Sequence, residues 1–101
     1  MNKNMKNNKK DRNTEMYEAI LTLETAEECI KFFDDLCSVT ELRAMEQRYH
    51  VAMLLNQGHI YNSILEQTGA SSATISRVNR SLMYGADGYE IAFKRLAEKK
   101  K

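Results

Sequence analysis

The 101-residue chain contains no proline, no tryptophan and only four glycines. No stretch of it approaches the ~18 consecutive apolar residues that a membrane-spanning helix needs. Its N-terminus, MNKNMKNNKK, is basic and is followed by no apolar stretch, so we expect no secretory signal peptide. We therefore expect a cytoplasmic protein that binds no membrane.

The chain has only two cysteines and two histidines. Cys29 and Cys37 are eight residues apart, which fits neither a CxxC redox pair nor a zinc site, and His50 and His59 add no ligand cluster. We interpret both cysteines as buried reduced thiols and expect no metal site. No nucleophile paired with a base, no paired catalytic carboxylates and no phosphate-binding loop are found, so we expect no enzyme.

The size and composition of the chain indicate one small globular domain. Apolar residues make up 43% and charged residues 29% of it, as in ordinary folded domains. A domain of this size buries only roughly 60 to 65% of the surface of its unfolded chain. A second copy would supply further apolar surface, which favours oligomerisation.

The net charge of +1 hides segments of opposite sign. Residues 1–13 carry a net charge of +4 and residues 14–47 one of −7, whereas residues 48–86 and 87–101 each carry +2. A protein with one end facing a polyanion fits this distribution, although solvated charged faces are common. Residues 1–13 are mostly Asn and Lys, which predicts a disordered basic tail that adds non-specific attraction to phosphates or serves solubility alone.

From Thr14 onward the apolar residues recur at spacings of three and four, which predicts an all-α domain over residues 14–99. Alternating strand patterns and hairpin turns are missing from the sequence. Six helices are expected: about 14–24, one beginning at a capping box at Thr25, one beginning at a capping box at Ser38 and ending before Gly58, then about 60–67, 72–84 and 87–99. The expected apolar face of the helix that begins at Thr25 comprises Ile30, Phe33 and Leu36 or Cys37. That of the helix beginning at Ser38 comprises Leu42, Met45, Tyr49, Ala52 or Met53 and Leu55. That of the last helix comprises Tyr89, Ala92, Phe93 and Leu96.

The segment IYNSILEQTGASSATISRVNRSL, from Ile60 to Leu82, has the pattern of a helix-turn-helix, which we place at about residues 60–84. Gly69 supplies the positive φ of a tight turn, and Ser71 or Ser72 can cap the second helix. The positions at which the two helices should face each other are Ile64, Thr68, Ala70, Ile75 and Val78.

The remaining side chains of the second helix are small or polar, and they have the chemistry that reads DNA. Hydroxyls bind phosphates or bases, Arg binds guanine and Asn binds adenine. The alternative is a solvated helix face without a ligand. The predicted DNA-binding residues are Ser71, Ser72, Ala73, Thr74, Ser76, Arg77, Asn79 and Arg80.

A capping box, a long helix carrying an arginine, a helix ended by glycine, and TGASSATISRVNRSL followed closely by a Tyr-Gly pair resemble the Trp repressor family, and within it the YerC/YecD subgroup. The resemblance covers about residues 14–99. It implies a six-helix, intertwined homodimer that presents two reading helices to successive major grooves of a palindromic operator.

The resemblance also implies an effector site formed by Arg48, Arg77 and Ser81. Two guanidinium planes can hold an indole between them, so tryptophan or another small effector is a candidate ligand; no other cofactor is expected. The alternative is that Arg48 pairs with Glu46 or another carboxylate and that Arg77 contacts phosphate.

We therefore expect a sequence-specific transcriptional regulator that binds double-stranded DNA as a homodimer and represses by occluding its operator, associated with the bacterial nucleoid when bound. The alternative function is a protein-interaction module that docks through its acidic N-terminal helices. Residues 14–47, with nine acidic and two basic side chains, are the basis for that alternative.

Overall fold

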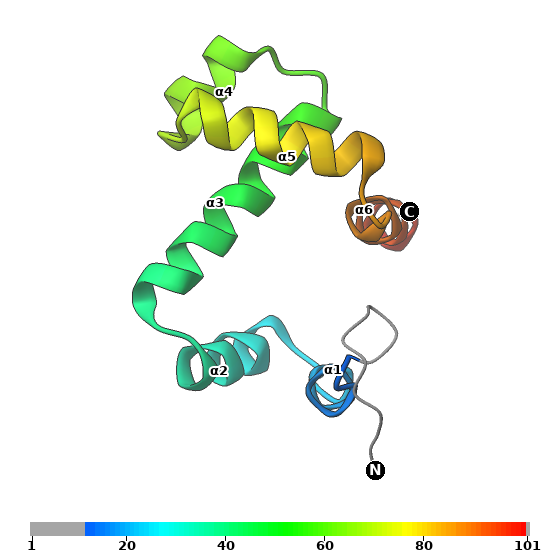
Figure 1. Ribbon diagram of the computed structural model, residues 1–101. Helices are drawn as coiled ribbons and strands as arrows, with labels where there is room; N and C mark the ends of the chain where they lie inside the picture. The colour runs from blue at the N-terminus through cyan, green and yellow to red at the C-terminus, as the bar shows by residue number, and fades with distance from the viewer. Residues whose placement is uncertain (1–11, 101) are drawn as a thin grey trace. The chain divides into compact units, whose positions relative to one another are not determined.

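The computed structural model describes residues 12–100, and within them the chain forms six α-helices and no strand, which confirms the predicted all-α class (Figure 1). The predicted tail, residues 1–13, lies outside the described residues except for Arg12 and Asn13, which precede the first helix. The helices are α1 (Glu15–Ile20), α2 (Ala26–Leu36), α3 (Val39–Asn56), α4 (Tyr61–Thr68), α5 (Ser72–Tyr84) and α6 (Gly88–Lys99). None of these helices is both long and apolar enough to cross a membrane.

The chain divides into two compact units, Met1–Ser38 and Val39–Lys101. In the first unit, the Thr25 hydroxyl accepts a hydrogen bond from the backbone N–H of Glu28 at 3.0 Å, so the predicted cap of α2 is confirmed. Neither α1 nor α2 contains a buried residue. The prediction of buried thiols is therefore wrong: Cys29 and Cys37 are free but only half-buried, because two short helices cannot enclose them.

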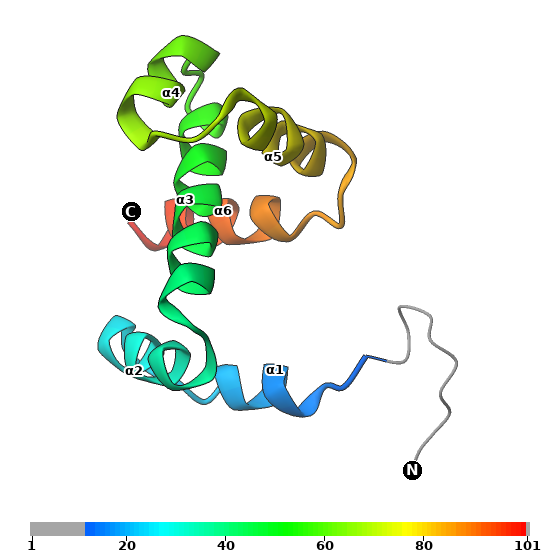
Figure 2. The same cartoon turned by 60° about the vertical axis from the view of Figure 1, so that its left-hand side comes forward.

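The second unit is built on α3, with α4 and α5 packed against the C-terminal half of that helix (Figure 2). The predicted interior of the helix-turn-helix is confirmed, since Ile64, Ala70, Ile75 and Val78 are buried and Thr68 is half-buried. The remaining buried core residues are contributed by α3: Val51, Ala52 and Leu54.

The face predicted for α3 is only in part the one that is buried: Ala52 is buried and Leu55 packs against the core, as predicted. Met45 and Tyr49 belong to the predicted stripe but remain exposed, whereas Val51 and Leu54 are buried under α4 and α5. The helix carries apolar side chains on more than one face, and packing selects among those faces. Periodicity alone therefore identified the helix and part of its buried side, but not the burial of Val51 and Leu54.

The last helix packs on α3 through aromatic rings. Tyr49 lies 5.7 Å from Phe93 and 6.5 Å from Tyr89 between ring centroids, and Tyr89 and Phe93 are stacked at 6.0 Å. Ala92 and Leu96, also predicted for this face, remain exposed. Of the predicted stripe on α6, Tyr89 and Phe93 therefore pack against the core within the chain.

Candidate nucleic-acid interface

The turn between α4 and α5 consists of three residues, 69–71. Gly69 has φ 71° and ψ 7°, and its N–H donates to the carbonyl of Leu65 at 2.9 Å. This is the left-handed conformation that ends a helix most easily at glycine. The predicted role of Gly69 in the turn is confirmed.

Two side chains hold this turn in place. The Thr68 hydroxyl donates to the carbonyl of Ile64 at 2.7 Å and accepts from the N–H of Ala70 at 3.1 Å. From α3, the Gln47 amide donates to the carbonyl of Thr68 at 3.2 Å. Helix spacing predicts that Thr68 lies in the interior but does not predict these bonds. The local signal for the Thr68 bonds is a threonine directly before a helix-ending glycine, whereas no local signal indicates the bond from Gln47.

The first turn of α5 is capped by Ser71, which settles the choice left open between Ser71 and Ser72. The Ser71 hydroxyl accepts from the N–H of Thr74 at 3.1 Å and donates to the Thr74 hydroxyl at the same distance. Thr74 is half-buried, whereas Ser72 is exposed. The Ser71 and Thr74 hydroxyls therefore fix the start of the helix, while Ser72 faces outward.

The outer face of α5 comprises five predicted DNA-binding residues, all exposed: Ser72, Ala73, Ser76, Arg77 and Arg80. Ala73, Arg77 and Arg80 recur at helical spacing, opposite the buried Ile75 and Val78. Within residues 12–100 neither Arg77 nor Arg80 has a hydrogen-bond or ion-pair partner. Two unpaired guanidinium groups beside small side chains form a cationic surface that can approach a DNA groove closely.

Asn79 is separated from this face. It is half-buried, and its amide donates to the Met83 sulfur at 3.6 Å. It also lines an open hollow with Leu82, on the side of α5 that faces α6. The structure therefore brings five of the eight predicted residues onto one exposed face, uses Ser71 and Thr74 for the cap and places Asn79 at the flank.

Neither of two open pockets in the second unit is lined by all three residues of the implied effector site. Ser81 lines a small open pocket of about 340 Å³ with Gly85 and Tyr89, and neither Arg48 nor Arg77 lines that pocket or the hollow beside Asn79. All three side chains are exposed. Within residues 12–100 no group of three or more His, Cys, Asp or Glu side chains is arranged to hold a metal ion.

Comparison with known proteins places these features in a family. Residues 12–97 match the model of the family described as Trp repressor protein. The chain is 49% identical over 84 residues to the uncharacterized protein YerC of Bacillus subtilis (strain 168), covering 83% of this chain and 81% of that protein.

Two solved structures share the fold. A Staphylococcus aureus protein assigned as a Trp repressor has a TM-score of 0.79 and 51% identity, covering 82% of this chain and 83% of that one. A TrpR like protein from Eubacterium eligens ATCC 27750 has a TM-score of 0.78 and 49% identity, covering 81% and 84% respectively. At these identities the similarity extends over the helix-turn-helix and the helices around it.

Proposed function

The chain belongs to the Trp repressor family, and on this premise we propose that it is a sequence-specific transcriptional regulator that reads its operator with the outer face of α5. The family is one of DNA-binding regulators and not of enzymes. The observation that carries the proposal is the exposed, unpaired pair Arg77 and Arg80 on a helix whose start is fixed by Ser71 and Thr74. A rigid helix that presents Arg, Ser and Ala can enter the major groove.

The protein acts as a homodimer and a repressor in this proposal. Large apolar side chains remain exposed on the single chain, among them Leu21 at 84% and Ile30 at 60%. A second copy would cover such side chains and would present two α5 helices to a palindromic operator, from which the dimer excludes other proteins. Its place of action is then the cytoplasm, on the nucleoid.

Tryptophan or another small effector remains part of the proposal through Arg48, Arg77 and Ser81. Arg77 belongs both to this set and to the outer face of α5. A ligand held by Arg77 would therefore either compete with DNA for its guanidinium group or change the direction in which that group points. The proposed effect of such a ligand is a change in operator affinity.

The test is recovery of bound fragments from sheared genomic DNA at physiological salt, with and without tryptophan, followed by sequencing. We expect a two-fold-symmetric motif whose half-sites lie about one helical turn, ~10 base pairs, apart. An Arg77→Ala/Arg80→Ala double variant serves as the control and should lose the enrichment. Uniform recovery of fragments under both conditions would overturn the proposal.

A second candidate function is a protein-interaction module, favoured by the exposed apolar side chains of the acidic α1 and α2. A pull-down from lysate that recovers no stoichiometric partner other than the chain itself would exclude this second function. Recovery of a defined partner by wild type but not by an Ile30→Glu variant would support it.

A further inference from the structure

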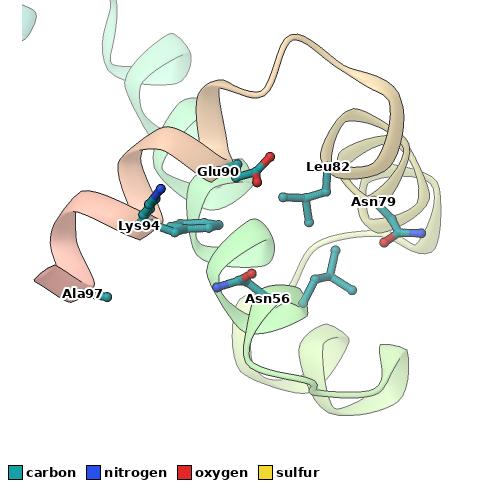
Figure 3. A pocket seen from close by; sticks show the side chains of 8 residues that line it. Asn56, Asn79, Leu82, Glu90, Lys94 and Ala97 are labelled. Atoms are coloured by element: carbon teal, nitrogen blue, oxygen red, sulfur yellow. The ribbon is translucent and has the colours of Figure 1, made fainter.

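The one amide side chain of α5 is turned away from the outer face of that helix. The sequence predicts that Asn79 contacts DNA, where an asparagine ordinarily binds adenine. Asn79 instead donates to the sulfur of Met83 at 3.6 Å and is one of the side chains that line the hollow between α5 and α6 (Figure 3). Residues 72–84 contain no Gln, Asp or Glu, so the outer face has no amide to bind adenine and no carboxylate to bind cytosine.

Helix geometry separates the two arginines of the outer face. Successive residues of an α-helix turn by about 100° and rise by about 1.5 Å. Ala73 and Arg80 therefore lie within about 20° of one line along α5. This line runs opposite the buried Ile75 and Val78, and Arg77 lies about 50° to one side of it. A helix that rests in a groove with its apolar side away from the DNA thus turns Ala73 and Arg80 toward the base edges and Arg77 toward one wall.

These two arginines supply all the cationic charge of the helix-turn-helix. They are the only Lys or Arg side chains among residues 49–86, so α4 and the turn offer no cation to the phosphates. Within residues 12–100 neither Arg77 nor Arg80 has a hydrogen-bond or ion-pair partner. Both guanidinium groups are therefore available to DNA, and base contacts and phosphate contacts have to be divided between them.

The positions of the two arginines suit different contacts. An arginine that faces the base edges can bind O6 and N7 of guanine through two hydrogen bonds, the commonest specific contact in the major groove. The small exposed side chains Ser72, Ala73 and Ser76 let the helix approach the bases closely, and the methyl group of an alanine packs on that of thymine. An arginine that faces a groove wall meets phosphates instead, and a phosphate contact carries no sequence information.

We infer that Arg80 binds a guanine in each half-site of the operator, that Ala73 contacts the methyl group of a nearby thymine, and that Arg77 binds a backbone phosphate. The rise of about 10 Å between Ala73 and Arg80, against ~3.4 Å per base pair, places the thymine about three base pairs from the guanine. Base preference at the guanine therefore depends on Arg80, whereas Arg77 contributes affinity alone. This inference names the DNA that the outer face of α5 selects, and so it rests on the proposed function.

Binding to a randomised DNA library, followed by sequencing, tests the guanine contact. Arg80→Ala should lose a preference for guanine of about 5- to 100-fold at one position of each half-site and should keep the rest of the motif. Arg77→Ala should keep the whole motif and weaken binding to all fragments alike. Arg43→Ala, an exposed arginine of α3, is the control and should change neither the motif nor the affinity.

Lysine variants and salt separate a base contact from attraction to phosphate. A lysine keeps the charge of an arginine but not the planar fork that meets two acceptors at once. Arg77→Lys should therefore bind about as tightly as wild type, whereas Arg80→Lys should lower the preference for guanine. Arg77→Ala should also reduce the slope of log K against log salt concentration by roughly two in a dimer, one phosphate for each protomer, and Arg80→Ala should reduce it less.

Single-atom changes in the operator give the closing test. 7-Deazaguanine at the assigned position lacks N7, and the loss of a hydrogen bond to a charged group should weaken wild-type binding about tenfold. Arg80→Ala should bind the two operators equally. Uracil in place of the assigned thymine removes one methyl group and should weaken wild-type binding about threefold, with no effect on Ala73→Ser.

The outcomes separate this inference from the proposed function. A library without any enriched motif would overturn the proposed function and this inference with it. A guanine preference that survives in Arg80→Ala or disappears in Arg77→Ala would overturn the inference alone, as would an operator on which 7-deazaguanine has no effect. Circular dichroism should show wild-type helical content in each arginine variant, because these side chains are exposed.

Discussion

Gly85, at the end of α5, is required for space rather than for backbone conformation. Its φ of −85° is accessible to any residue, but a Cβ built on it would collide with the carbonyl oxygen of Ser81. The N–H of Gly85 donates to that same carbonyl at 2.9 Å, so the close approach is part of the helix end. Asp87, two residues later, adopts the left-handed conformation instead, with φ 69°.

We predict that Gly85→Ala lowers the free energy of unfolding by about 1–3 kcal/mol, the usual cost of overpacking. The matched control is Gly88→Ala, because a Cβ there meets nothing within 4 Å and Gly88 is the first residue of α6. The control should be neutral or slightly more stable. Urea unfolding at equal protein concentration measures both, and equal midpoints for the two variants would contradict the steric argument.

Thr68 should matter through its hydroxyl rather than its size. We predict that Thr68→Val lowers the free energy of unfolding by about 1–3 kcal/mol, because the N–H of the buried Ala70 loses its acceptor. Thr68→Ser keeps the hydroxyl and should retain most of the stability. Thermal unfolding of the two variants is the measurement, and a serine variant as unstable as the valine variant would refute this role.

At the scale of the elements, α5 presents three different surfaces. Its inner side packs Ile75 and Val78 into the core, its outer face exposes Arg77 and Arg80, and its flank turns Asn79 toward the hollow. A change on the flank therefore reaches the outer face through one rigid helix. This division predicts that substitutions on the outer face alter DNA binding without altering folding.

For the outer face we predict that Arg77→Ala/Arg80→Ala weakens operator binding about 30-fold or more, since each base or phosphate contact contributes ~1–3 kcal/mol. Both side chains are exposed, so the helical content should not change. The measurement is fluorescence anisotropy on a recovered operator at fixed salt. Arg43→Ala, an exposed arginine of α3, is the control and should bind as wild type; full affinity of the double variant would exclude this face.

At the scale of the whole molecule, the two compact units differ in how much they bury. The unit from Val39 to Lys101 contains every core residue described, whereas α1 and α2 contain none. Helices of 6 and 11 residues with exposed apolar side chains are marginal unless another surface covers them. A second copy of the chain is the covering surface that we propose.

We predict a particle of twice the chain mass of 11.7 kDa in sedimentation equilibrium, with a thermal midpoint that rises with protein concentration. Ile30→Glu should weaken association tenfold or more, about 1.4 kcal/mol, because it places a charge in the covered surface. Lys31→Glu, an exposed neighbour, is the control and should associate normally. A wild-type monomer at all concentrations would contradict the dimer.

Local chemistry was enough to predict six helices and the turn, although the first helix ends at Ile20 and not near residue 24 as predicted. Thr25 caps α2, Gly69 ends α4, and the spacing of Ile64, Ala70, Ile75 and Val78 identifies the inside of the helix-turn-helix. Each of these depends on residues within a few positions of one another along the chain. The outer face of α5 follows from the same spacing.

What the sequence by itself determined was therefore the all-α class, the helix-turn-helix and most of the exposed outer face of its second helix, because helix periodicity and capping are local. Only the tertiary structure decided that Val51 and Leu54 form the buried side of α3 and that Asn79 faces the hollow. The bond from Gln47 to the turn likewise joins residues 21 positions apart. Such choices depend on which of several apolar or polar faces meets a distant element, and no local pattern contains that information.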